Sequence, residues 1–208
     1  MVTAGRRVRS DALATRALLL RTAERLFAER GVHAVSNRQI AEAAGQGSNS
    51  AVGYHIGTKA DLVAAIIQAH AAPMDRVRER MLRRAEGSGD LRAYVACLVL
   101  PVTGHLADLG VPSWYARFAA QMSIDPVLRT VVMASATASP EMRRVMDGVL
   151  ALLPRDPMVT QRAGMVRHLI IHTCADQEQA LADGNAPRAD TWPRTGALLI
   201  DAIEALLT

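Results

Sequence analysis

Lysine, aromatic residues and cysteine are all scarce in this sequence of 208 residues. Lys59 is the only lysine, so 23 of the 24 basic residues are arginines, and Phe, Trp and Tyr together make up 3% of the chain. The two cysteines, Cys97 and Cys174, are too few for a disulfide framework, and neither lies in a Cys-x-x-Cys pair. We therefore expect two buried thiols in a reducing compartment.

Long apolar runs are also missing. The longest, such as residues 95–102, fall far short of the roughly 20 residues that a membrane-spanning helix needs. Near the N-terminus, Arg16, Arg21 and Glu24 interrupt any apolar core that a signal peptide would require. These absences argue against a membrane protein and predict a cytoplasmic one.

The rest of the composition is that of a globular protein. Hydrophobic residues make up 50% of the chain and charged residues 21%, which argues against a mainly disordered or fibrous chain. A chain of this length forms one large domain, or a small domain fused to a larger one. It buries enough surface to fold without a disulfide or a metal.

The excess positive charge is concentrated at one end. Residues 1–60 hold nine basic and four acidic side chains, whereas residues 61–208 hold 15 basic and 16 acidic ones. Such an asymmetry indicates contact with nucleic acid or another acidic surface. A basic, solvated tail that includes Arg6, Arg7 and Arg9 would also explain part of it.

The N-terminal third has the pattern of short helices separated by turns. Apolar residues recur at helical spacing over 12–30, and Ser36 opens a Ser-x-x-Gln capping box before a short helix. Turn-forming residues follow, then one or two helical turns over 50–55, and Thr58 opens a second box before a helix over 59–72. Three helices joined by short, glycine-containing turns predict a helix-turn-helix.

Three segments of this region are recognisable together. Residues 26–31 (Leu-Phe-Ala-Glu-Arg-Gly), 40–45 (Ile-Ala-Glu-Ala-Ala-Gly) and 54–62 (Tyr-His-Ile-Gly-Thr-Lys-Ala-Asp-Leu) resemble the N-terminal domain of the tetracycline-repressor (TetR) family of bacterial transcriptional regulators. Two residues depart from the family's pattern. Ile56 replaces the usual Phe, and Gly53 lies inside the expected recognition helix. There it costs about 1 kcal/mol of helix propensity relative to Ala and offers no side chain to a base.

The resemblance implies an all-α fold with two domains. Residues 1–60 would form a three-helix helix-turn-helix domain, and residues 61–208 a larger helical ligand-binding and dimerisation domain. The implied function is DNA-binding transcription regulation, by a dimeric repressor that a small apolar ligand releases from a palindromic double-stranded operator. An activator shares the same head. The alternative from another class is a helical small-molecule-binding or metal-sensing module with a degenerate DNA-binding head, which Gly53 favours.

Candidate DNA contacts lie at helix starts and around the recognition helix. Asn at the start of that helix pairs bidentately with adenine, although Asn and Ser are also favoured there as caps. In the family, the positions of Tyr54 and His55 contact phosphate, and packing under the first helix is the alternative. Lys59 lies in a first helical turn, where the helix dipole disfavours a cation, so we expect a phosphate partner. The predicted contacts are Ser36, Arg38, Ser48, Asn49, Ser50, Tyr54, His55 and Lys59.

The remainder of the chain is also helical in period, without strand-like alternation. Its last two helices carry apolar stripes that are either a homodimer interface, as the resemblance implies, or ordinary intramolecular core. The expected helices are at about 74–86, 90–109, 113–123, 125–135, 140–152, 157–182 and 191–207. The stripe residues are Met165, Leu169, His172, Leu181, Leu198, Ile200, Ile203 and Leu207.

The resemblance further implies a ligand cavity between the middle helices. Small-molecule sites combine apolar walls with a few polar groups, although Met and aromatic residues at helical spacing are more often core. The candidate lining residues are Tyr94, His105, Trp114, Tyr115, Phe118, Met122, Met133, Met146 and His168.

The sequence offers no constellation for catalysis. His168 and His172 share a helical face, as a zinc pair would, but neither a third ligand nor a glutamate base accompanies them. Nucleophile motifs and phosphate-cradling glycine loops are absent. We therefore expect no enzyme activity, no metal and no cofactor.

Overall fold

The computed structural model describes residues 2–46, 51–154 and 158–208. Over these residues the chain forms ten helices and no strand, so the predicted all-α class is confirmed. In chain order the helices are α1 (Val2–Arg30), α2 (Asn37–Ala43), α3 (Ala51–His55), α4 (Lys59–Ala85), α5 (Leu91–Leu109), α6 (Tyr115–Ile124), α7 (Leu128–Ala138), α8 (Pro140–Leu152), α9 (Val159–Ala182) and α10 (Thr191–Leu207).

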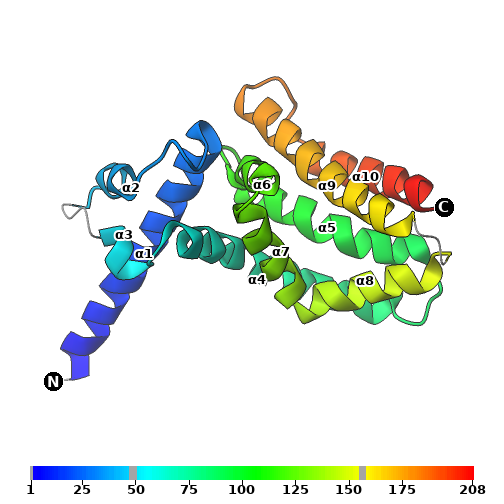
Figure 1. Cartoon of the computed structure of the whole chain (residues 1–208), viewed down its shortest axis with the longest axis horizontal. Helices are drawn as coiled ribbons and strands as arrows, with labels where there is room; N and C mark the ends of the chain where they lie inside the picture. Colours follow the sequence, from blue (N-terminus) through cyan, green and yellow to red (C-terminus); the bar gives the residue numbers. More distant parts are fainter. Residues whose placement is uncertain (1, 47–50, 155–157) are drawn as a thin grey trace.

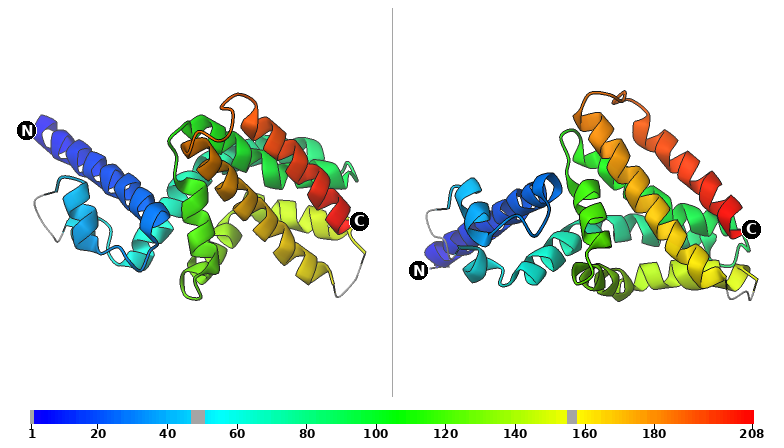
Figure 2. Two further views of the ribbon diagram at one scale, coloured as in Figure 1. Left: turned by 90° about the horizontal axis from the view of Figure 1, so that it is seen from above. Right: turned by 45° about the horizontal axis from the view of Figure 1, so that its top comes forward.

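The molecule consists of a small head and a larger bundle. Figure 1 shows α1, α2 and α3 at one end, with α4 running from this head into the bundle of α5–α10. In the bundle, α5 packs against α4, α8 and α10, and α9 packs against α6 and α10. Figure 2 shows α1 and α2 projecting away from the bundle, while α9 and α10 lie side by side.

Two buried apolar clusters hold the head and the bundle together. The N-terminal cluster joins Phe27 of α1, Ile40 of α2 and Val52 of α3 to Leu62 of α4. It also includes Phe118 of α6, whose ring stacks on that of Phe27 with centroids 6.3 Å apart. The head is therefore anchored on α6 as well as on α4. The bundle cluster contains Leu82, Val95, Leu106, Val145, Leu199 and Ile203 among others.

Both predicted capping boxes are present. The Ser36 hydroxyl accepts a hydrogen bond from the Gln39 N–H, and the Gln39 side chain accepts one from the Ser36 N–H at 2.8 Å. Thr58 and Asp61 form the same pair of bonds at the start of α4. The bonds from Thr58 lower the pKa of the Asp61 carboxyl. Local sequence thus determines where α2 and α4 begin.

Two expected helix boundaries are wrong. α1 begins at Val2 rather than near residue 12, so the basic segment with Arg6, Arg7 and Arg9 belongs to this helix. α4 runs through Pro73, so the helices expected at 59–72 and 74–86 are one. Pro73 removes one intrahelical hydrogen bond, but α4 is buried at Ile66 before it and at Met74 after it, and this packing outweighs that loss.

The sparse cysteines are buried, as expected. Cys97 and Cys174 are free thiols in the bundle cluster, and burial raises the pKa of Cys174 to about 12. None of the described helices combines the length and the apolar character that crossing a membrane requires.

Candidate nucleic-acid interface and ligand cavity

The short helix α3 rests on the head through its first two residues. Ala51 and Val52 are buried, whereas Gly53 and Tyr54 face outward, and 85% of Tyr54 is exposed. The half-buried His55 ring meets the Tyr54 ring edge-on, with centroids 5.0 Å apart. Packing under the first helix is therefore the wrong interpretation for Tyr54. An exposed aromatic side chain at this position is free to meet a partner.

Three of the predicted DNA contacts directly precede α3 in the sequence. Ser48, Asn49 and Ser50 lie outside the described residues, so their proposed contacts to bases stay predictions. A Cβ added at Gly53 would meet nothing within 4 Å. Intramolecular packing therefore does not require glycine there.

Lys59 has an intramolecular role that the sequence did not predict. Its ammonium donates hydrogen bonds to the carbonyl oxygens of Val32 at 2.9 Å and Val35 at 2.8 Å. These bonds tie the start of α4 to the loop after α1 and explain a cation in this turn without a phosphate. Because an ammonium has three N–H donors, one remains beyond these two bonds.

Ser36 and Arg38 are exposed, but both are engaged within the head. The Ser36 hydroxyl caps α2. The Arg38 Nε donates to Glu42 at 2.7 Å, and this bond raises the pKa of Arg38. Exposed ion pairs of this kind are weak because water screens them, so a phosphate could replace Glu42 as the partner of Arg38.

A row of polar side chains connects the head to the bundle. His70 of α4 bonds through Nε2 to Glu24 of α1 at 2.9 Å and through Nδ1 to Nε2 of His105 at 2.7 Å. If a neutral His70 donates to Glu24, its Nδ1 must accept from His105. Tyr115 stacks on His70, with centroids 3.9 Å apart. Burial first, and then the interaction with the neighbouring His70 ring, lower the pKa of His105 to about 4, so His105 is neutral at pH 7.

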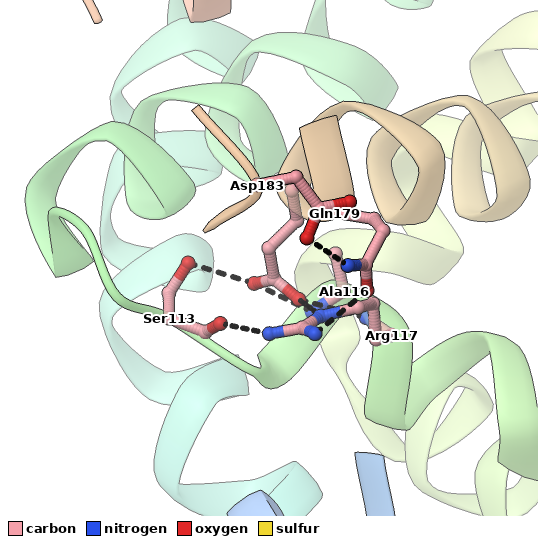
Figure 3. Close-up of polar contacts among 6 residues, drawn as sticks. Ser113, Ala116, Arg117, Gln179 and Asp183 are labelled. Carbon is pink, nitrogen blue, oxygen red and sulfur yellow. Dashed lines mark hydrogen bonds and ion pairs between the residues drawn. The ribbon is translucent and has the colours of Figure 1, made fainter. Parts of the chain in front are cut away.

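A buried carboxylate from α9 caps the start of α6. Glu178 accepts hydrogen bonds from the Ser113 hydroxyl at 2.8 Å, from the Ala116 N–H at 3.2 Å and from the Arg117 N–H at 3.0 Å. Arg117 also reaches across to Gln179 at 2.8 Å, as Figure 3 shows. These contacts satisfy N–H groups that have no partner inside α6. They fix α6 to α9, and α6 in turn packs against α1.

An apolar cavity of about 470 Å³ lies among α5, α7, α8, α9 and the end of α10. This volume is within the usual range of small-molecule sites. Two of the predicted ligand contacts, Met133 and Met146, line it. Its walls are otherwise aliphatic, with one more methionine, Met142, and one charged side chain among the described lining residues, Arg167.

The other predicted ligand contacts lie away from this cavity. His105 and Tyr115 belong to the row of polar side chains between head and bundle. Phe118 and Met122 are fully buried in the N-terminal cluster, and Trp114 packs against it. Tyr94 is buried between α5 and α8, and His168 is exposed on α9.

Arg167 was not among the predicted ligand contacts, although the sequence contained a signal for it. Val159, Ala163, Val166 and Ile170 recur at helical spacing, and all four line the cavity. Arg167 lies on this same stripe. A charged residue on an apolar helical face is rarely buried without a partner, which makes it a candidate for ligand contact.

His168 and His172 do not form a metal site with other described residues. Their rings lie one helical turn apart, with centroids separated by 6.0 Å, and both are exposed. Within the described part of the chain, no group of three His, Cys, Asp or Glu side chains is arranged to hold a metal ion.

Comparison with known proteins agrees with the geometry of the head. Residues 19–66, from the end of α1 to the start of α4, match the family model described as bacterial regulatory proteins, tetR family. A search of the curated proteins finds no match.

Solved structures of similar chains cover nearly the whole molecule. One is a TetR family transcriptional regulator, PfmR, from Thermus thermophilus, with 15% identity and a TM-score of 0.49 over 92% of this chain and 94% of that one. Another is a gamma-butyrolactone receptor (ArpA-like protein), with 23% identity and a TM-score of 0.48 over 92% of this chain and 99% of that one.

Proposed function

Because the chain is a member of the tetR family of bacterial regulatory proteins and carries that family's DNA-binding domain, we propose that it is a dimeric repressor that a small apolar ligand releases from a palindromic operator. Residues 1–60 form the DNA-binding domain, and residues 61–208 bind the ligand and the second subunit. The observation that carries DNA binding is Tyr54, an aromatic side chain left 85% exposed on the recognition helix. It lies in the part of the chain that holds the excess positive charge.

The proposed contacts divide into base readout and phosphate binding. Ser48, Asn49 and Ser50 read bases from the start of the recognition helix in the major groove. The flanking side chains bind phosphate and set the orientation of the head. This second group contains Ser36, Arg38, Tyr54, His55 and Lys59.

A dimer is proposed because two recognition helices must reach half-sites about one helical turn apart. Met165 of α9 and Leu198 of α10 support α9 and α10 as the interface, since 55% and 63% of these apolar residues are exposed. Leu181, Ile203 and Leu207 are buried within the chain. That part of the predicted stripe is intramolecular core.

Ligand release is proposed to act through α4. The cavity is lined by α7 and α8, and both helices pack against α4, whose first turn lies in the head. A ligand that binds better when α4 is tilted favours a spacing of recognition helices that no longer matches successive major grooves. It releases DNA only to the extent that it discriminates between the two conformations.

The first test is selection of bound sequences from random duplex DNA, followed by a salt titration on the enriched sequence. We expect a palindrome with half-sites about one turn apart and a steep loss of affinity with salt, because several phosphates are contacted. Repression is then tested with the selected palindrome placed in the promoter of a reporter gene. Enrichment of a sequence without two-fold symmetry would contradict the dimer.

A second candidate is a small-molecule-binding module whose head no longer reads DNA. Gly53 favours it, because the exposed face of α3 offers no side chain at that position. No enriched sequence, together with weak binding that moderate salt abolishes, would support this candidate over the repressor.

A further inference from the structure

Arg167 lies at the wall of the apolar cavity and has no charged partner among the residues that the structure describes. Its Nε is buried and has no hydrogen-bond partner among the described residues. Its Nη1 contacts the sulfur of Met133, a weak acceptor, and its Nη2 lies 3.4 Å from Nε2 of His168. Leaving a buried donor unsatisfied costs free energy. The described part of the cavity wall therefore contains a donor that lacks an acceptor.

Other arginines of the bundle have the charged partner that Arg167 lacks among the described residues. Arg78 is paired with Asp75 and also donates to a backbone carbonyl. Arg117 is paired with Glu178, and Arg144 has carboxylates on both sides. In these cases the chain itself supplies the acceptor. For Arg167 Nε, no described residue supplies one.

The remaining wall indicates what else the ligand carries. Leu98, Val102 and Val149 are typical of its aliphatic part, and the described lining residues include no aromatic ring. Planar aromatic ligands gain from stacking on rings, which this wall does not offer. Met142 and Met146 are long and flexible and adapt to an irregular apolar chain.

We propose that this cavity binds a straight-chain aliphatic carboxylic acid, with its carboxylate paired to Arg167 and its hydrocarbon chain lying among the methionines and aliphatic side chains. The pair supplies the buried Nε with a charged acceptor, and such charge-assisted bonds are among the strongest in proteins. This assignment rests on the proposed function, because it identifies the effector of the repressor as a fatty acid.

The test is calorimetric titration of the full chain, without DNA, with dodecanoate below its micelle concentration and with methyl dodecanoate. We expect dodecanoate to bind the wild type and Arg167→Gln to weaken it roughly 10- to 100-fold, the size of a lost charged hydrogen bond. Methyl dodecanoate is expected to bind more weakly and to be insensitive to the substitution. Arg162→Gln on the same helix, away from the cavity wall, serves as the matched control and is expected to leave both affinities unchanged.

Three results would overturn the assignment: equal affinity of wild type and Arg167→Gln for dodecanoate, equal affinity of the wild type for acid and ester, or binding of 2-naphthoate in preference to dodecanoate.

Arg167→Met provides a readout that does not need the ligand. Because it removes the unsatisfied donor, we expect it to raise the thermal midpoint of the unliganded protein. A lowered midpoint would mean that Arg167 supports the fold, which also contradicts the assignment.

Gel-shift assays with the selected operator separate this assignment from the proposed function. Dodecanoate is expected to release DNA from the wild type at concentrations that leave the Arg167→Gln complex intact. Binding of dodecanoate through Arg167 without any operator would contradict the repressor and keep the ligand. A selected operator without dodecanoate binding would support the repressor and contradict the ligand assignment.

Discussion

Lys59 shows, at the scale of a single residue, how one side chain serves two purposes. Its bonds to the carbonyls of Val32 and Val35 hold the start of α4 against the loop after α1. The same ammonium lies in the head that we propose binds DNA. Under the proposed function, folding and DNA affinity depend on the same side chain, and a substitution must be measured for both.

We expect Lys59→Gln to lower the free energy of unfolding by about 2 kcal/mol, because two hydrogen bonds from a charged donor are lost. We expect it also to weaken binding to all DNA sequences by the same factor, as loss of a phosphate contact does. Urea unfolding measures the first effect, and gel shifts on specific and random duplexes measure the second. Arg38→Gln, an exposed cation of the same head, is the control that should weaken DNA binding without loss of stability.

His105 is expected to make stability depend on pH. Its pKa is about 4 in the fold and 6.5 for the unperturbed side chain, so the unfolded chain binds more protons between these values. The part of the folding stability that depends on a neutral His105 is fully present above pH 6.5 and is lost as the pH falls toward 4. Urea unfolding at pH 7 and at pH 4.5 should show a smaller loss for His105→Gln than for the wild type. A His172→Gln control, at an exposed histidine, should show the wild-type loss.

Between elements, the contact that fixes α6 to α9 depends on one acidic side chain. Glu178 is 1% exposed and caps α6 with both carboxylate oxygens. We expect Glu178→Ala to lower the free energy of unfolding by about 3 kcal/mol, because it leaves the Arg117 guanidinium without its carboxylate and the first N–H groups of α6 without their acceptor. Glu178→Gln keeps one oxygen and should cost less. Equal stability of Glu178→Ala and the exposed control Asp176→Ala, measured by urea unfolding, would contradict this role.

Helices were predictable where their limits are set by local signals. α8 and α10 have the expected bounds of 140–152 and 191–207, and both capping boxes of the head are present. These signals act between residues a few positions apart. The break expected at Pro73 is absent because packing holds α4 at Ile66 and Met74, and no local pattern contains that packing.

The candidate sites were harder to predict than the helices. Tyr94 and Phe118 were assigned to the cavity, but they lie in the two buried clusters. Which face of a helix meets a cavity depends on the packing of several elements. Tyr94 illustrates this, because its ring fits where Gly148 of α8 has no side chain, and a Cβ there would lie 2.0 Å from the ring. The apolar stripe of α9 marks Arg167 as a candidate, but the missing partner of its Nε among the described residues becomes apparent only once its neighbours are placed.

At the scale of the whole molecule, operator binding is expected to depend on dimerisation. Leu198→Asp places a charge on the exposed apolar face of α10, where 63% of the residue is accessible. We expect a monomer in analytical ultracentrifugation, and a loss of affinity for the palindrome that exceeds the loss for a single half-site. Ile124→Asp, which changes a similarly exposed residue outside α9 and α10, should remain a dimer. A Leu198→Asp variant that stays dimeric would move the interface to another surface.

The length of α4 has a mechanical consequence. α4 has 27 residues, and at a rise of about 1.5 Å per residue it is a rod of roughly 40 Å. If the end near the cavity acts as a fulcrum, a rotation of about 5° moves the other end by roughly 3 Å, as much as the length of a hydrogen bond. α4 therefore converts a small rotation near the cavity into a larger displacement of the head. Side chains around a bound molecule need to shift by only a fraction of the distance through which the DNA-facing end travels.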